Sequence, residues 1–104
     1  MSASIIVLAK VTFSDKLPPP KKEPAFPKEF YPMFKVRTDG IYNCGMIQLI
    51  DVPSSKPGET VTAKINFLTN GELKAWIYPG KEFSFYHGKL LLGEGEILTI
   101  VTEQ

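Results

Sequence analysis

Residues 76–97 read WIYPGKEFSFYHGKLLLGEGEI, and the most informative pattern of the chain lies in this stretch. From Glu82 to His87 apolar and polar side chains alternate, with Phe83 and Phe85 on the same face. Such alternation predicts a strand with one buried face. A Gly88-Lys89 turn then leads into another apolar run. The stretch therefore predicts an antiparallel hairpin.

Two glycines interrupt the returning arm of this hairpin. Gly93 and Gly95 flank Glu94, so they share one face of an extended chain. Glycine weakens a strand, and it also leaves room for backbone or an aromatic ring to approach closely. We therefore expect a break at these glycines, with strand segments at residues 89–92 and 96–102.

Alternation of the same kind recurs along the chain. It is clearest at residues 60–69, where Val61, Ala63, Ile65 and Phe67 alternate with polar residues. We expect further strands at residues 4–13, 31–38, 46–52 and 72–78, and turns at Asp39-Gly40, Pro57-Gly58, Asn70-Gly71 and Pro79-Gly80. No segment has a convincing helical period. The pattern predicts an all-β sandwich or barrel, and a small closed barrel is favoured because closure leaves no unpaired strand edge.

The size and composition of the chain narrow its class. Its 104 residues suit a single domain, residues 1–104. The net charge is +1, so no strong overall field favours nucleic acid or a membrane surface. Cys44 is the only cysteine, which excludes an internal disulfide and fits a reducing compartment. No apolar run approaches the length of a membrane span. We expect a cytoplasmic protein without membrane contact.

Residues 14–30 differ from the rest in composition and predict a long loop. They hold Pro18, Pro19, Pro20, Pro24 and Pro27 among Lys16, Lys21, Lys22 and Lys28. Prolines cannot donate to a ladder, and loops this long are often functional. The lysines could contact phosphates, or they could belong to a solvated loop in which acidic residues cancel part of the charge. The Lys21-x-x-Pro24-x-x-Pro27 spacing also fits a polyproline ligand.

Several stretches together resemble one known family. Tyr31–Thr38 resembles a run that reads Arg-Pro-Gln-Phe-Tyr-Phe-Arg-Thr in the C-terminal barrel, domain III, of elongation factor Tu. Pro57-Gly58-Glu59 resembles the Pro-Gly-Asp turn of that barrel. Gly80–Gly95 keeps the glycine spacing of its end, and Ile5–Phe13 would be its first strand. The resemblance covers nearly the whole chain and implies a standalone six-stranded antiparallel Greek-key β-barrel.

The resemblance also implies a history of RNA and protein contacts, because the family's barrel helps to hold aminoacyl-tRNA and contacts the nucleotide-exchange factor. The chain departs from the family where those contacts are made. The Lys/Pro-rich loop replaces one family loop, and Tyr86–Leu90 stands in place of Arg-Glu-Gly-Gly-Arg. No phosphate-binding Gly-x-x-x-x-Gly-Lys motif occurs, so nucleotide binding is not expected. We expect that the chain has kept the barrel fold of the family and has lost the family's role in tRNA delivery.

The expected function is therefore binding, to a protein or, as an alternative, to RNA. Trp76 and Tyr78 would share one face of their predicted strand, exposed if Ala75 and Ile77 face the core and buried otherwise. An RNA contact would use lysines and Arg37, with Tyr31 stacking on a base. The candidate binding residues are Lys21, Lys22, Tyr31, Arg37, Trp76, Tyr78 and Lys89.

No catalytic or metal-binding group is expected. His87 is the only histidine, and it lies at a hairpin end without a serine or cysteine partner at a suggestive spacing. One histidine cannot make an ordinary zinc site, and Cys44 lies in a different turn. We predict neither an enzyme nor a cofactor.

Overall fold

The computed structural model describes residues 3–15, 26–36, 38, 40, 42–69 and 73–103. A 3-10 helix, η1 (Leu73–Trp76), lies between two of the long strands. The strands are β1 (Ala3–Phe13), β2 (Phe26–Pro27), β3 (Glu29–Phe30), β4 (Met33–Lys35), β5 (Asn43–Leu49), β6 (Ser54–Ser55), β7 (Thr60–Thr69), β8 (Glu82–His87) and β9 (Leu90–Glu103).

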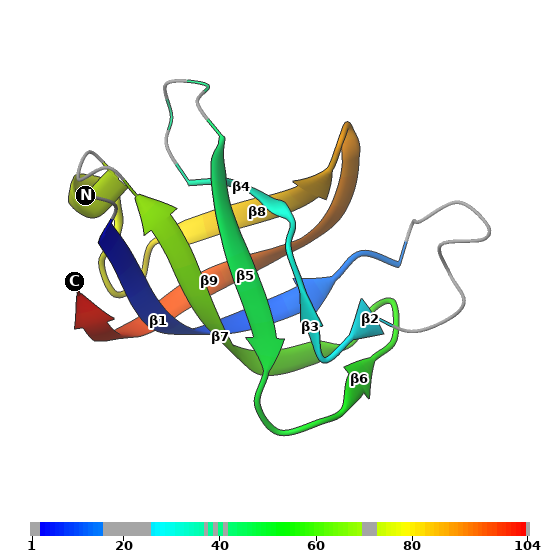
Figure 1. Ribbon diagram of the computed structural model, residues 1–104. Helices are drawn as coiled ribbons and strands as arrows, with labels where there is room; N and C mark the ends of the chain where they lie inside the picture. Colours follow the sequence, from blue (N-terminus) through cyan, green and yellow to red (C-terminus); the bar gives the residue numbers. More distant parts are fainter. Residues whose placement is uncertain are drawn as a thin grey trace.

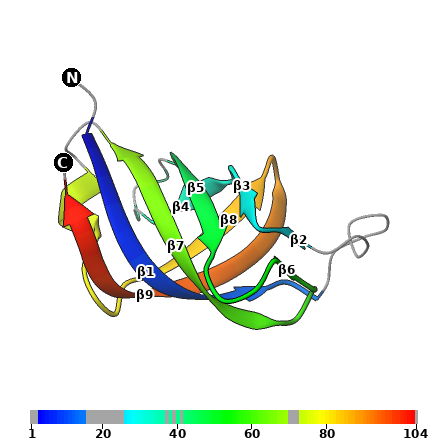
Figure 2. The same cartoon turned by 60° about the horizontal axis from the view of Figure 1, so that its bottom comes forward.

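The strands form a closed antiparallel barrel (Figures 1 and 2). Around it the order is β1-β7-β5-β4-β8-β9, and β9 pairs with β1 to close the ring. Both β3 and β4 pair with the same edge of β5, so they act as one strand interrupted at Tyr31-Pro32. Strand β1 lies beside β7 and not beside the β3/β4 strand that follows it in the chain, which is a Greek-key order. The predicted six-stranded barrel is confirmed.

Phenylalanine rings occupy the centre of the barrel. Phe34 lies between three others, with ring centroids 4.9 Å from Phe67, 5.9 Å from Phe83 and 6.2 Å from Phe85. Such edge and tilted contacts add to the stabilisation from burial. The inward positions are those that alternation predicts, and the buried apolar residues include Val7, Ala9, Val11, Phe34, Val36, Ala63, Ile65, Phe67, Phe83, Phe85 and Ile97.

Three glycines make room for these rings. A β-carbon built on Gly93 would lie 2.6 Å from Phe85 Cζ, and one on Gly45 would lie 2.8 Å from Phe34 Cε2. The predicted close approach of aromatic rings to the glycines is confirmed. The predicted break in the strand is wrong, because β9 runs through both Gly93 and Gly95. The rings of β8 fill the space of the missing side chains, so these glycines fit a paired strand.

Strand β9 contains three register shifts. The shift against β8 pairs Leu91 with Tyr86, so both side chains lie on the outer face. Without the shift, Leu91 would share the inner face with Gly93, two residues on. Two shifts against β1 leave Leu98 and Val101 as the extra residues, and both are exposed. The shifts therefore bring three apolar side chains of β9 toward the surface.

The Pro57-Gly58 turn has the predicted type II geometry. Glu59 N–H donates to the Lys56 carbonyl at 3.1 Å, and Gly58 has a φ of +87°. A positive φ at the third turn position is what this turn type requires of glycine. The Glu59 carboxylate accepts a further 2.6 Å hydrogen bond from Lys56 N–H. The turn thus holds the chain in register at the start of β7.

The strand predicted at residues 72–78 is wrong, because residues 73–76 form η1. Leu73 and Ile77 are both buried, four residues apart, and Ala75 between them is exposed. Spacing of four residues suits one face of a helical turn, and Pro79 prevents a longer helix. The Asn70-Gly71 turn lies outside the described residues, and β7 pairs with β1 and β5 and not with a following strand.

Three other boundaries differ from the predicted ones. The second part of the predicted loop at residues 14–30 contains β2, which pairs with β6, and β3, which pairs with β5. Phe26 stacks on Phe13 with ring centroids 4.2 Å apart, so this segment packs against the aromatic core. The strand predicted at 31–38 is shortened to β4, and the one predicted at 46–52 is shifted to β5.

Candidate protein-interaction surface

One row of outward side chains crosses four strands of the barrel. Cys44 of β5 pairs with Met33 of β4, Met33 pairs with Tyr86 of β8, and Tyr86 pairs with Leu91 of β9. Tyr42 lies just before β5 and packs on Tyr86, with ring centroids 5.6 Å apart and an interplanar angle of 75°. We call these five residues the tyrosine–methionine patch.

The tyrosine–methionine patch is partly open to solvent although its side chains are apolar or aromatic. Tyr42 is 42% exposed and Met33 is 36% exposed, and Cys44 is exposed as well, whereas Tyr86 and Leu91 are half-buried. The Cys44 Sγ–H donates to Met33 Sδ at 3.8 Å, so the two sulfur atoms touch. Tyrosine and methionine are enriched at protein interfaces, tyrosine because one end is apolar and the other polar.

The neighbouring outward rows have a different character. The next row carries Lys35, Ser84, Glu94, Thr12 and Thr60 on successive strands. The row after it carries Glu82, Glu96, Lys10 and Thr62. These polar rows are what a solvated barrel face requires. The tyrosine–methionine patch is therefore a local departure from the polar surface.

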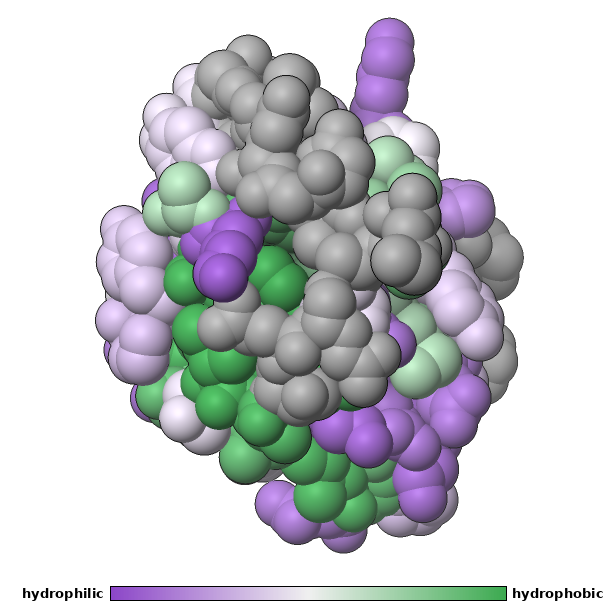
Figure 3. Space-filling view, turned by 60° about the vertical axis from the view of Figure 1, so that its left-hand side comes forward, coloured by the Kyte–Doolittle hydropathy of each residue, from purple (hydrophilic) through white to green (hydrophobic). Residues whose placement is uncertain are grey.

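A second apolar surface lies over β7, β1 and β9. Leu68, Leu98 and Val101 are exposed there, beside the half-buried Ile6 and Leu8. Figure 3 shows hydrophobic surface on this side of the molecule. Its side chains are aliphatic, and leucine and valine are under-represented among the residues that dominate interface energies. The tyrosine–methionine patch is the better candidate for specific recognition.

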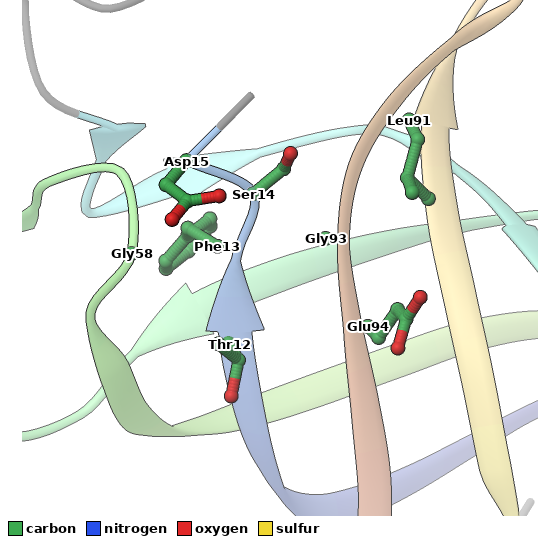
Figure 4. Close-up of a pocket in the computed structure, with 8 residues that line it drawn as sticks. All are labelled: Thr12, Phe13, Ser14, Asp15, Gly58, Leu91, Gly93 and Glu94. Atoms are coloured by element: carbon green, nitrogen blue, oxygen red, sulfur yellow. The ribbon is translucent and has the colours of Figure 1, made fainter. Parts of the chain in front are cut away.

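A pocket of about 300 Å³ adjoins the patch at Leu91. It opens where β1 ends and the β8–β9 hairpin bends away from it (Figure 4). Its lining combines apolar surface, hydroxyl groups and two carboxylates, from Thr12, Phe13, Ser14, Asp15, Gly58, Leu91, Gly93 and Glu94. The pocket shares Leu91 with the tyrosine–methionine patch and adds two carboxylates beside it.

Two of the candidate residues from sequence lie near this surface. Tyr31 is 76% exposed and stands two residues before Met33 of the patch. Lys89 is exposed in the turn that joins β8 to β9, directly after the segment that carries Tyr86. Lys21, Lys22 and Arg37 lie outside the described residues. The structure thus places two of the predicted residues at one end of β8.

Trp76 is the last residue of η1, and Tyr78 lies between η1 and the start of β8, so both precede the opposite end of β8. Trp76 is half-buried and packs against the core, whereas Tyr78 is 49% exposed. Lys81 Nζ lies 5.4 Å from the Trp76 ring and 5.9 Å from the Tyr78 ring, within cation–π range. These two aromatic residues therefore belong to a site of their own, separated from the patch by the length of β8.

The residues of the patch were not found by sequence reasoning, although one signal was present. Tyr86 follows Glu82 and Ser84 in the outward phase of β8, where a polar residue is expected. Tyrosine is enriched at protein interfaces, so an aromatic residue in this phase is a signal for a contact surface once neighbouring apolar residues join it. The partners of Tyr86 come from three other strands, and only the register brings them together.

The part of the chain that the structure describes holds no group of three or more His, Cys, Asp or Glu side chains arranged to bind a metal ion. Within the same residues, no helix has the length and apolar character needed to cross a membrane. No protein-family model matches the chain, and a search of curated proteins gave no match.

Proposed function

We propose that the protein is a non-enzymatic binding module that docks a protein partner on the tyrosine–methionine patch. The observation that carries this proposal is the apolar row from Cys44 to Leu91 on the outside of a closed barrel. The buried core is formed by the inward side chains, and none of the five patch residues belongs to it. Exposed contiguous apolar surface of this kind commonly marks an interaction site.

We further propose that the module is a standalone relative of elongation factor Tu domain III that works in the cytoplasm. The support is the combination of the three sequence stretches with a closed Greek-key barrel in which those stretches take structural roles. Pro57-Gly58 sets the register of β7, and Gly93 and Gly95 receive aromatic rings. In this proposal the barrel fold is inherited from the family, and the outward residues that bind a partner are new.

A photocrosslinking experiment tests the docking proposal. The photoreactive residue p-benzoylphenylalanine replaces Tyr42 in the patch or, as the control, exposed Glu96 in one of the polar rows. We expect a discrete protein adduct in cells from position 42 and none from position 96. Adding Met33→Gln and Tyr86→Thr should abolish the adduct at position 42 while the thermal unfolding midpoint stays close to that of the parent. Equal adducts from both positions would contradict the proposal.

RNA binding is the second candidate, and the exposure of Tyr31 favours it. A ring that is 76% exposed can stack on a base, and the adjacent hairpin turn supplies Lys89 as a cation. The carboxylates of Asp15 and Glu94 border the same region and would repel phosphates. A filter-binding titration with tRNA at several salt concentrations tests this alternative. Tyr31→Ala and Lys89→Gln should each weaken binding, and the absence of binding at low salt would exclude it.

A further inference from the structure

The pocket beside Leu91 has a lining that suits one particular kind of side chain. Leu91 belongs both to the tyrosine–methionine patch and to the pocket, so a partner lying on the patch passes the pocket mouth. Figure 4 shows Asp15 after the end of β1 on one side of the space, and Leu91, Gly93 and Glu94 of β9 on the other. The hollow thus offers an apolar side chain at Leu91 and a carboxylate on each side.

The two carboxylates differ in their surroundings. No hydrogen bond or ion pair joins Asp15 to another described residue. The described residues of the pocket lining include no lysine or arginine. Glu94 is bordered by Lys10 and Lys35, which line two other grooves of the outer face that do not include Asp15. Within the described part of the chain, a cation from another molecule would therefore meet no competing basic side chain in this pocket.

The shape of the lining distinguishes between kinds of cation. Lysine and arginine have long aliphatic stems that pack along apolar surface while their charged heads reach polar groups. Here the stem would lie along Leu91, and the head would meet a carboxylate. The hydroxyl group of Thr12 is a further acceptor at the lining. A volume of about 300 Å³ is ample for one such side chain.

We infer that this pocket receives a lysine or arginine side chain from a short segment of the partner protein whose apolar residues lie on the tyrosine–methionine patch. The inference rests on the proposed docking function and gives its partner a chemical class. The segment carries a basic residue next to apolar ones. Guanidinium or ammonium pairs with the carboxylates of Asp15 and Glu94, and the binding weakens with salt because both carboxylates are near the surface.

The first experiment probes the pocket without the patch. N-acetyl-arginine methylamide is titrated into the isotopically labelled protein, and backbone amide shifts are followed by NMR. We expect shifts at Asp15, Gly58 and Glu94, and affinity at least ten-fold above that of the neutral analogue N-acetyl-citrulline methylamide. Asp15→Asn and Glu94→Gln should each reduce the affinity at least three-fold. The matched control Glu96→Gln changes the next outward glutamate of β9, which does not line this pocket, and should leave the affinity unchanged.

The second experiment tests whether one ligand binds the pocket and the patch together. A library of seven-residue peptides is selected on the intact protein, and we expect a basic residue beside aromatic or aliphatic ones in the selected peptides. Peptides that need Met33 and Tyr86 but not Asp15 and Glu94 would overturn the pocket inference and leave the docking proposal standing. Arginine binding at the pocket by NMR, with no peptide that depends on the patch, would support the pocket and count against the docking proposal. Tighter binding of calcium chloride than of the arginine probe at the same amides would identify a metal site and overturn the inference.

Discussion

Gly95 lies directly opposite Phe83, and the phenyl ring occupies the place that a side chain at Gly95 would need. The two residues are paired across β8 and β9, and a β-carbon on Gly95 would lie 2.6 Å from Phe83 Cζ. The pair Gly93 and Phe85 repeats the arrangement two residues along. The aromatic rings of the core thus fill the space that the glycines of β9 leave free, and each depends on the other for close packing.

The first prediction concerns this fit. Gly95→Ala should lower the free energy of unfolding by about 2 kcal/mol, because the added methyl group overpacks the core against the Phe83 ring and the Lys10 carbonyl. Urea unfolding followed by circular dichroism measures the change. Phe83→Leu should recover part of the loss in the double variant, since the two sites are in contact. Ser84→Ala on the outer face of β8 is the control, and a stability of Gly95→Ala as close to the parent as this control would contradict the fit.

The second prediction uses the turn before β7. Gly58 has a φ of +87°, so Gly58→Ala should cost about 1 kcal/mol, and Gly58→Asn should cost less because asparagine tolerates this conformation better. Thermal unfolding of the three proteins gives the order. An alanine variant that is more stable than the asparagine variant would show that the turn relaxes to another type.

The third prediction separates a helical turn from a strand at residues 73–77. Ala75→Gln should be tolerated within about 0.5 kcal/mol, because Ala75 is exposed in η1. Leu73→Ala should cost about 2 to 4 kcal/mol, since its side chain is fully buried. In a strand the two residues would share one face and respond alike. A large loss of stability for both substitutions would therefore restore the strand interpretation.

The fourth prediction uses Cys44 as a reporter on the tyrosine–methionine patch. Because its thiol is exposed and the chain has no other cysteine, iodoacetamide should modify the native protein completely and at one site. A bulky maleimide at Cys44 should remove the crosslink expected from position 42 without unfolding the barrel. Cys44→Ser treated with the same maleimide is the control and should keep the crosslink. Undiminished crosslinking of the modified protein would mean that the partner does not cover this part of the patch.

The local alternation of apolar and polar residues was sufficient to predict two of the strands. Residues 60–69 and 82–87 form strands with the predicted bounds and inward faces. The strand prediction for residues 72–78 was wrong, because the four-residue separation of Leu73 and Ile77 fits one face of a strand as well as one face of a helical turn. Short apolar runs cannot be assigned by periodicity alone.

The candidate site was harder to predict, because its residues meet only through register. Met33, Cys44 and Tyr86 come from three strands, and nothing in their own neighbourhoods indicates that they form one row. Leu91 is on the outer face only because the shift in β9 reverses its phase. Asp15 and Glu94 border one pocket although they are far apart in the sequence. These relations are properties of the folded barrel and not of any local stretch.

Strand β9 also bears on how the protein is made. It pairs with both β8 and β1, so the last strand of the barrel to leave the ribosome is the one that closes the ring. Until β9 has been synthesised, one side of β1 and one side of β8 have no neighbour, and non-local pairings of this kind form slowly. We therefore expect the nascent chain to stay open until translation has passed β9, and to need protection by a chaperone at its unpaired strands during that time.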